Sequence, residues 1–166
     1  MRVKKSWLAR CWLCLFVLSL YAIKAVADTT TMTVKVTVVA PPPCIINGDR
    51  MIEVDFGSSV VTVEVDGVSY LKTVDYSLDC QGGPSNAMKL QVRGTPTDFN
   101  NNALQTNIAD LGILLRVNNA QVAINDWVNF TYPDKPVISV APVKRPGATL
   151  PGGDFSAGAT LVVVYQ

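Results

Sequence analysis

The chain has 166 residues, 49% of them hydrophobic, with fourteen basic and thirteen acidic side chains and no histidine. This length is enough for one domain of ordinary size. Because histidine is absent, the Ser–His–Asp and Cys–His arrangements of nucleophilic catalysis are excluded, and we expect no enzymatic activity.

Residues 1–27 have the three parts of a secretory signal peptide. The first ten residues carry four basic side chains and no acid, an apolar run extends from Cys11 to Ile23, and Ala25-Val26-Ala27 supplies the small-residue end. A membrane anchor is the alternative, but spanning a bilayer takes about 20 apolar residues and this run is shorter. We expect cleavage after Ala27. The remaining chain has nine basic and thirteen acidic residues, a net charge of −4, which gives no reason to propose nucleic acid as a partner.

The next feature is an alternating segment that ends at three prolines. In a strand, one row of side chains would be apolar: Met32, Val34, Val36 and Val38. The prolines at 41–43 cannot donate ladder hydrogen bonds and hold the chain extended. The segment therefore reads as one strand set apart by a stiff spacer. It either closes the sheet of its own domain or inserts into the sheet of another molecule.

The body of the chain reads as strands separated by turns. Alternating patterns occur at 52–56, 74–78 and 88–92, and a β-branched run over 60–65 ends at the turn pair Asp66-Gly67. Residues 112–117 are suited to a buried strand, 121–130 to a strand pair or a bent strand, and 137–141 to a short strand. In the last segment Ala159, Leu161, Val163 and Tyr165 share one face. Helical periodicity is absent except around Leu104–Leu111, so we predict an all-β sandwich.

Several residues have a structural interpretation that we favour over a chemical one. Cys44 and Cys80 remain after signal removal, and in an exported chain one disulfide is the default; a two-cysteine metal site is the alternative, but no histidine can complete it. The carboxylates of Glu53 and Asp55 should form a solvated strand face. Trp127 is expected in the core. No helical pattern follows Gly152-Gly153, so we expect no phosphate-binding loop, metal or cofactor.

Four features of the chain occur together in a specific order and spacing. The alternating extension over 29–39 is followed by Pro-Pro-Cys and by the stretches 45–48 and 52–57; the second feature is the spacing of Cys44 and Cys80. The third is an ending with Gly153 fourteen from the C-terminus and Tyr165 next to last, and the fourth is the stretch over 107–113. Together they resemble the structural subunits of chaperone–usher fimbriae, the pili of Gram-negative bacteria. The family's extensions often have a glycine midway, where this chain has Val36.

The resemblance implies an immunoglobulin-like β-sandwich that lacks its last strand, with an N-terminal donor-strand extension and one disulfide, Cys44–Cys80. The implied organisation is a signal peptide (1–27), the extension with its proline spacer (28–43) and a pilin domain (44–166). Met32, Val34, Val36 and Val38 would be the donor residues. The groove edge that meets the chaperone would include Gly153, Phe155, Leu161, Val163, Tyr165 and Gln166.

The resemblance also implies partners and a location. A periplasmic pilus chaperone, the outer-membrane usher and neighbouring subunits would bind the chain on its way through the periplasm to a surface fimbrium. One domain with an extension is typical of a polymerising subunit, and the sequence around the prolines and 45–48 is closer to minor, adaptor-type subunits that support cell adhesion. A major rod pilin is the main alternative. A self-contained exported immunoglobulin-like binding domain is the alternative from another class.

Overall fold

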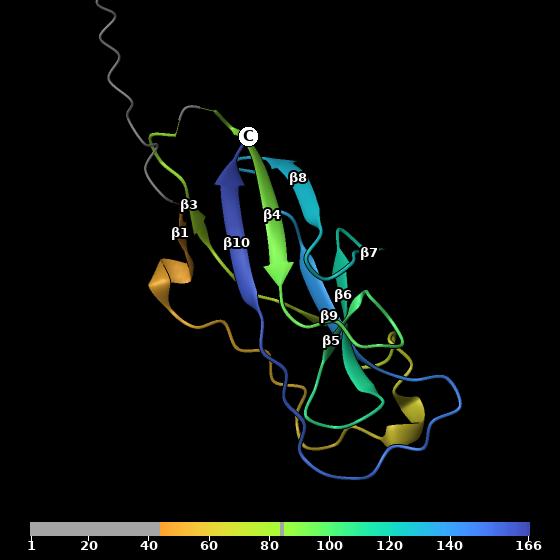
Figure 1. The fold of residues 1–166 in the computed structure, drawn as a ribbon. Helices are drawn as coiled ribbons and strands as arrows, with labels where there is room; N and C mark the ends of the chain where they lie inside the picture. Colours follow the sequence, from red (N-terminus) through yellow and green to blue (C-terminus); the bar gives the residue numbers. More distant parts are fainter. Residues whose placement is uncertain (1–43, 84) are drawn as a thin grey trace, which may run out of the picture. The chain divides into compact units, whose positions relative to one another are not determined.

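A computed structural model of the chain describes residues 44–83 and 85–166, which form an all-β domain (Figure 1). The expected signal peptide (1–27), the extension (28–43) and its alternating residues lie outside the described residues. Within the described ranges, no helix is long and apolar enough to span a bilayer. The elements in chain order are β1 (Ile45–Ile46), η1 (Asn47–Asp49), η2 (Thr62–Glu64), β2 (Lys72–Thr73), β3 (Leu78–Asp79), β4 (Ala87–Arg93), β5 (Ala103–Gln105), β6 (Leu111–Val117), β7 (Ala120–Gln121), β8 (Trp127–Thr131), β9 (Ile138–Lys144) and β10 (Thr160–Tyr165).

The strands form two larger antiparallel sheets and one short pair. The first sheet has the order β10–β4–β8. The second has the order β2–β9–β6–β5, and β7 pairs with β6 beside it. The short pair joins β1 to β3. In Figure 1, β10 and β4 lie side by side along the first sheet, with β8 next to β4.

The core lies where apolar side chains of the two larger sheets meet. Leu90 and Val92 of β4 come from the first sheet and pack in one cluster with residues of β5, β6 and β9: Leu104, Ile113, Leu115, Ile138 and Val140. All are buried. Sheets packed face to face through alternating inward residues make a sandwich, which confirms the predicted all-β class.

The β1–β3 pair is held by the disulfide between Cys44 and Cys80. Ile45 pairs with Asp79, so each cysteine lies directly beside the two-residue ladder. The prediction of a disulfide bridge between neighbouring strands is therefore confirmed, and the alternative of a metal site for these cysteines is wrong.

The β-branched run over 60–65 is not the strand that its composition predicts. Residues 62–64 form the 3₁₀ turn η2, and the Asp66 carboxylate accepts hydrogen bonds from the backbone N–H groups of Val68 (2.8 Å) and Ser69 (2.6 Å). The Val61 N–H donates to the Tyr70 hydroxyl at 3.1 Å. These local bonds satisfy the backbone without a strand ladder, which overrides β-propensity.

The weak helical periodicity around Leu104–Leu111 does not correspond to a helix. Ala103–Gln105 is strand β5, paired with β6, and the chain then turns. The Thr106 hydroxyl lies 3.0 Å from the Ile108 carbonyl and 2.9 Å from the Leu111 carbonyl, and it accepts the Ile108 N–H at 3.1 Å. A side chain that bonds its own neighbouring backbone in this way favours a turn over a helix.

Strand β9 is longer than the predicted 137–141 because it continues through Pro142. The Pro142 carbonyl accepts the Gly67 N–H at 3.0 Å, so it points away from β6. The N–H and C=O of a strand residue point to the same side, so the missing N–H of the proline deprives β6 of no bond. Strand β2 reaches only as far as Val140, and the neighbour of Pro142 on that side is the turn at Asp66-Gly67. A proline is tolerated there because the Gly67 carbonyl accepts a hydrogen bond from Arg116 (3.4 Å) instead.

Two polar clusters connect loops to the sandwich. Tyr76 is 3% exposed, its hydroxyl donates to the Pro136 carbonyl, and burial raises its pKa to about 12. Arg145 donates to both Asp98 oxygens at 2.6 and 2.7 Å and also to Asp110. Hydrogen bonding from the Arg145 guanidinium lowers the pKa of the Asp98 carboxyl.

Trp127 corrects another expectation, because it is 39% exposed and is not a core residue. It is on β8 with Lys89 of the neighbouring strand β4, whose Nζ lies 4.9 Å from the ring centre. A cation over an indole face stabilises an exposed position for the ring.

Candidate functional site

The first sheet ends at β10, which has one strand neighbour, β4, among the described residues. The other edge of β10 faces a groove of about 720 Å³ whose opposite wall is the segment 50–56. A strand edge without a neighbour presents backbone N–H and C=O groups that another strand can pair with. We call this space the edge groove.

Apolar side chains form both the floor and the walls of the edge groove. Ile52, Val54 and Phe56 line it from the segment 50–56, and Leu161 lines it from β10. Its floor is made of core residues of the two sheets: Val92, Leu104, Ile113, Leu115, Ile138 and Val140. The groove is therefore open to the hydrophobic core itself.

The segment 50–56 shows the alternation that the sequence predicts, but it is not a strand. Ile52, Val54 and Phe56 are half-buried, whereas Met51, Glu53 and Asp55 are exposed; Arg50, at the start of the segment, is exposed as well. The carboxylates of Glu53 and Asp55 thus face solvent as expected. The segment forms no strand ladder among residues 44–83 and 85–166.

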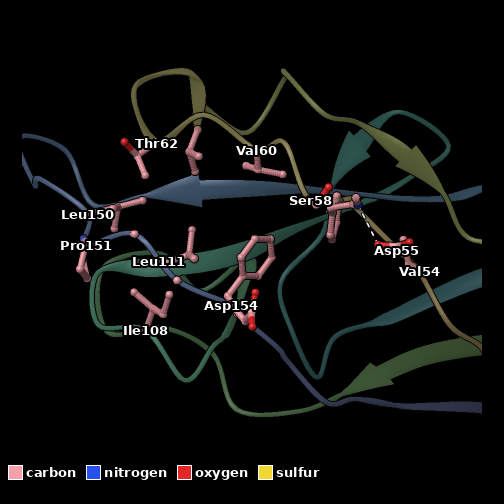
Figure 2. A pocket seen from close by; sticks show the side chains of 16 residues that line it. Val54, Asp55, Ser58, Val60, Thr62, Ile108, Leu111, Leu150, Pro151 and Asp154 are labelled. Atoms are coloured by element: carbon pink, nitrogen blue, oxygen red, sulfur yellow. Dashed lines mark hydrogen bonds between the residues drawn. The ribbon is translucent and has the colours of Figure 1, made fainter.

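A second cavity of about 320 Å³ lies next to the edge groove. We call it the end cavity. Figure 2 shows Ile108, Leu111 and Leu150 gathered at its apolar end, with Val60 and Thr62 along the other side. Buried Val65, Leu111 and Leu150 form a small core cluster of their own.

Phe155 lies at the junction of the two spaces. It lines both the edge groove and the end cavity, and it packs against both core clusters. Its ring centre is 5.9 Å from that of Phe56, which also lines both spaces. The aromatic pair therefore lies where the apolar edge groove meets the end cavity, whose lining also includes polar residues such as Ser58 and Asp154.

The C-terminal end of β10 is held in place by polar contacts. The Tyr165 hydroxyl donates to the Cys80 carbonyl at 3.3 Å, and the ring lies so close to Gly83 that any Cβ there would overlap it. The Gln166 side chain donates to the Met88 carbonyl (2.9 Å) and to Asn129 (2.7 Å). The end of the chain is thereby fixed beside the disulfide.

The structure places some, but not all, of the residues predicted for the groove edge at the two spaces. Phe155 and Leu161 line the edge groove, Gly153 and Phe155 line the end cavity, and Val163 packs against the main core cluster without lining either space. Tyr165 and Gln166 lie beyond the groove at the disulfide end. Sequence reasoning missed the end cavity, although Ile108 and Leu150 are isolated apolar residues in polar loops and could have indicated it.

The chemistry available at these two spaces is apolar contact and backbone pairing. In the described part of the chain, no group of three or more His, Cys, Asp or Glu residues is placed to hold a metal ion. The charged residues of the lining are Asp49 and Arg50 at the edge groove, and Asp55 and Asp154 at the end cavity. A continuous apolar groove beside an unpaired strand edge can accept an extended segment with alternating apolar side chains.

Comparisons with known proteins give one consistent result. A family described as "Fimbrial protein" matches residues 31–166. The fimbrial-like proteins YfcR and YfcQ of Escherichia coli (strain K12) are each 35% identical to the chain; the matches cover 92% of the chain and 91% of YfcR, and 78% of the chain and 83% of YfcQ. The P pilus adaptor subunit PapF has a similar structure, with a TM-score of 0.56 and 27% identity over 76% of this chain and 98% of that one. The P pilus rod subunit PapA has a TM-score of 0.61 and 25% identity over 75% of this chain and 100% of that one.

Proposed function

Because the chain belongs to the fimbrial protein family and is a fimbrial subunit of the chaperone–usher type, we propose that it polymerises by donor-strand exchange. In this proposal, residues 28–43 of one subunit supply a strand to the edge groove of the next one. Membership of the family indicates a structural rather than an enzymatic role, at the cell surface after export through the periplasm.

The observation that carries the proposal is the edge of β10 that has no strand neighbour among residues 44–83 and 85–166, beside a groove that opens to the core. Adding a strand there satisfies the backbone edge and covers the apolar floor at the same time. Pilins are themselves a standard example of this recognition mode. The alternating row that begins at Met32 and ends at Val38 has the spacing that such a groove requires.

The energy available to such an insertion is large compared with the stability of a domain. Each buried valine or methionine side chain contributes about 1.5–3 kcal/mol, and the row has four of them. A typical domain is stable by about 5–15 kcal/mol. An empty edge groove would therefore leave the domain weakly stable and prone to edge-to-edge aggregation.

The same hazard supports a periplasmic chaperone and an outer-membrane usher as partners. A subunit with an open groove needs a protecting strand between export and assembly, and the chaperone would supply it. The set from Gly153 to Gln166 that the resemblance assigns to the groove edge is the proposed contact, with Phe155 and Leu161 inside the groove and Tyr165 at its end. The signal peptide (1–27) and the pilin domain (44–166) complete the proposed organisation.

We place the chain among minor, adaptor-type subunits that support adhesion, in line with its 27% identity to the adaptor PapF. The major rod pilin is the second candidate, and the TM-score of 0.61 to the rod subunit PapA favours it. Quantitative mass spectrometry of purified fimbriae separates the two roles. A rod subunit accounts for most of the fimbrial protein mass, whereas a minor subunit accounts for a small share.

The test of donor-strand exchange compares two forms of the chain. The bare form has residues 41–166, and the rearranged form has residues 41–166 followed by a flexible linker and residues 29–40. Donor-strand exchange predicts that the bare form aggregates or unfolds at low denaturant, and that the appended strand adds several kcal/mol of stability. Reversible unfolding of the bare form at ordinary stability, unchanged by the strand, would refute the proposal and favour a self-contained binding domain.

A further inference from the structure

The solvent-facing rim of the edge groove carries its charge on one wall. On the wall 50–56 the exposed residues are Arg50, Met51, Glu53 and Asp55. The Arg50 guanidinium donates to the Asn47 carbonyl at 3.4 Å, and the Asp55 carboxylate accepts the Gly57 N–H at 2.7 Å. In the described ranges Glu53 makes no ion pair, since both ion pairs there involve Arg145. The other wall, β10, has no charged residue from Thr160 to Tyr165.

The extension of this chain has a matching charge. Residues 29–39 contain one ionisable side chain, Lys35, and otherwise only threonine, valine and methionine. When Met32 and Val38 and the two valines between them face a groove, alternation places Lys35 on the opposite face, toward solvent. A strand seated in the edge groove would thus present its lysine at the rim.

A register that centres residues 32–38 on residues 50–56 would place Lys35 opposite Glu53. Lys35 is the midpoint of the seven residues 32–38, and Glu53 is the midpoint of the seven residues 50–56. Centring one segment on the other brings the two midpoints together whether the strands run parallel or antiparallel. Cβ atoms of directly opposite residues on paired strands are about 4.5–5.5 Å apart, well within reach of a lysine and a glutamate.

We infer that Glu53 on the groove rim recognises Lys35 of a second copy of this chain, and that the edge groove is thereby adapted to accept the subunit's own extension. The inference depends on the proposed donor-strand exchange and adds the identity of the donor. Apolar side chains supply the affinity of insertion, and the ion pair fixes the register and favours a like subunit. A subunit that accepts its own extension can form a run of consecutive copies in a fibre.

The charge-swap experiment uses the rearranged chain, with residues 29–40 after the linker, in four forms: unchanged, Lys35→Glu, Glu53→Lys, and both together. An exposed ion pair changes an equilibrium by about two- to fivefold. Each single change should therefore raise the unfolded-to-folded ratio at fixed urea by at least that factor, because it places like charges together. The double change should reverse most of the rise, and an ionic strength of about 1 M should reduce all the differences.

Two controls make the experiment specific. Asp126→Lys makes the same charge change at an exposed residue that lines neither space, and it should show no coupling to residue 35. The second control moves the lysine by two positions, with Lys35→Thr and Thr33→Lys. The lysine stays on the solvent face but no longer lies opposite Glu53, so its coupling to Glu53 should weaken. Additive effects of Lys35→Glu and Glu53→Lys, in a chain that the strand does stabilise, would overturn the inference and leave donor-strand exchange intact.

A second measurement covers the case in which the rearranged chain does not fold. Multimers of the full chain, collected from the periplasm, are treated with a zero-length carbodiimide that joins amines to contacting carboxylates. The expected product is an intermolecular peptide pair linking Lys35 to Glu53. Multimers in which Lys35 couples to other carboxylates and never to Glu53 would overturn the inference.

Discussion

Truncation of Phe155 gives the sharpest test of whether a strand covers the edge groove. Removing a fully buried phenylalanine side chain costs about 3–5 kcal/mol, and its loss as an aromatic partner accounts for about 0.5–1.5 kcal/mol of the effect. Phe155 is half-buried in the described domain, so Phe155→Ala would cost about 2–3 kcal/mol if the groove stayed open. With a strand seated over the ring, the cost should approach the upper range, about 3–5 kcal/mol.

Phe130→Ala is the matched control, because Phe130 is also half-buried against the main core cluster but lines neither space. The assay is urea unfolding of the rearranged chain, followed by the fluorescence of Trp127, the single tryptophan in residues 28–166. We expect Phe155→Ala to cost about 1.5 kcal/mol more than Phe130→Ala, which is the difference between the midpoints of the two ranges. Equal losses in the two variants would refute the idea that the appended strand covers Phe155.

Two further predictions concern the pH dependence of stability. The pKa of Tyr76 is about 12 in the folded chain, against about 10 when unfolded, so stability should fall as the pH rises from 10 to 12, by at most ~2.7 kcal/mol. Tyr76→Phe should remove that fall in alkaline unfolding curves, and an unchanged slope would contradict it. The lowered pKa of Asp98 gives stability that is present above its unfolded pKa of about 3.9 and is lost as the pH falls through the lower folded pKa. A lysine cannot form the paired hydrogen bonds that the Arg145 guanidinium makes to Asp98, so Arg145→Lys should reduce the fall in melting temperature below about pH 4. The same fall in the variant and the unchanged chain would contradict this prediction.

The sequence predicts those strands in which each face keeps one environment, buried or exposed, from one end of the strand to the other. Alternation at 88–92 and over 159–165 corresponds to β4 and β10, and the apolar run over 112–117 corresponds to β6. These strands are specified by burial, which the hydrophobic pattern records directly. The alternation at 52–56 correctly indicated which side chains face the protein and which face solvent, but the segment forms no strand ladder among the described residues.

The sequence does not predict the structure where side chains form hydrogen bonds to nearby backbone groups, or where a strand has a neighbouring strand along only part of one edge. Asp66 and Tyr70 hold the 60–65 run in a turn, and Thr106 does the same after β5. Pro142 reads as a strand terminator but lies within β9, because its nitrogen faces the side where β2 has already ended. The edge groove was predictable only through the family resemblance, since a missing strand leaves no mark in local periodicity. The end cavity depends on loops that meet only in the folded chain, so no spacing rule gives Ile108 and Leu150 as neighbours.

The disulfide has a mechanical consequence for a subunit linked through its N-terminal side. A pull on the chain before Cys44 enters the domain at that residue and passes covalently to Cys80, 36 positions later. The residues between them, including the groove wall 50–56, cannot be drawn out as slack while the bridge is intact. Fully extended, those positions would lengthen the chain by roughly 120 Å. The bridge thus acts as a stop that keeps tension from unravelling this wall of the edge groove.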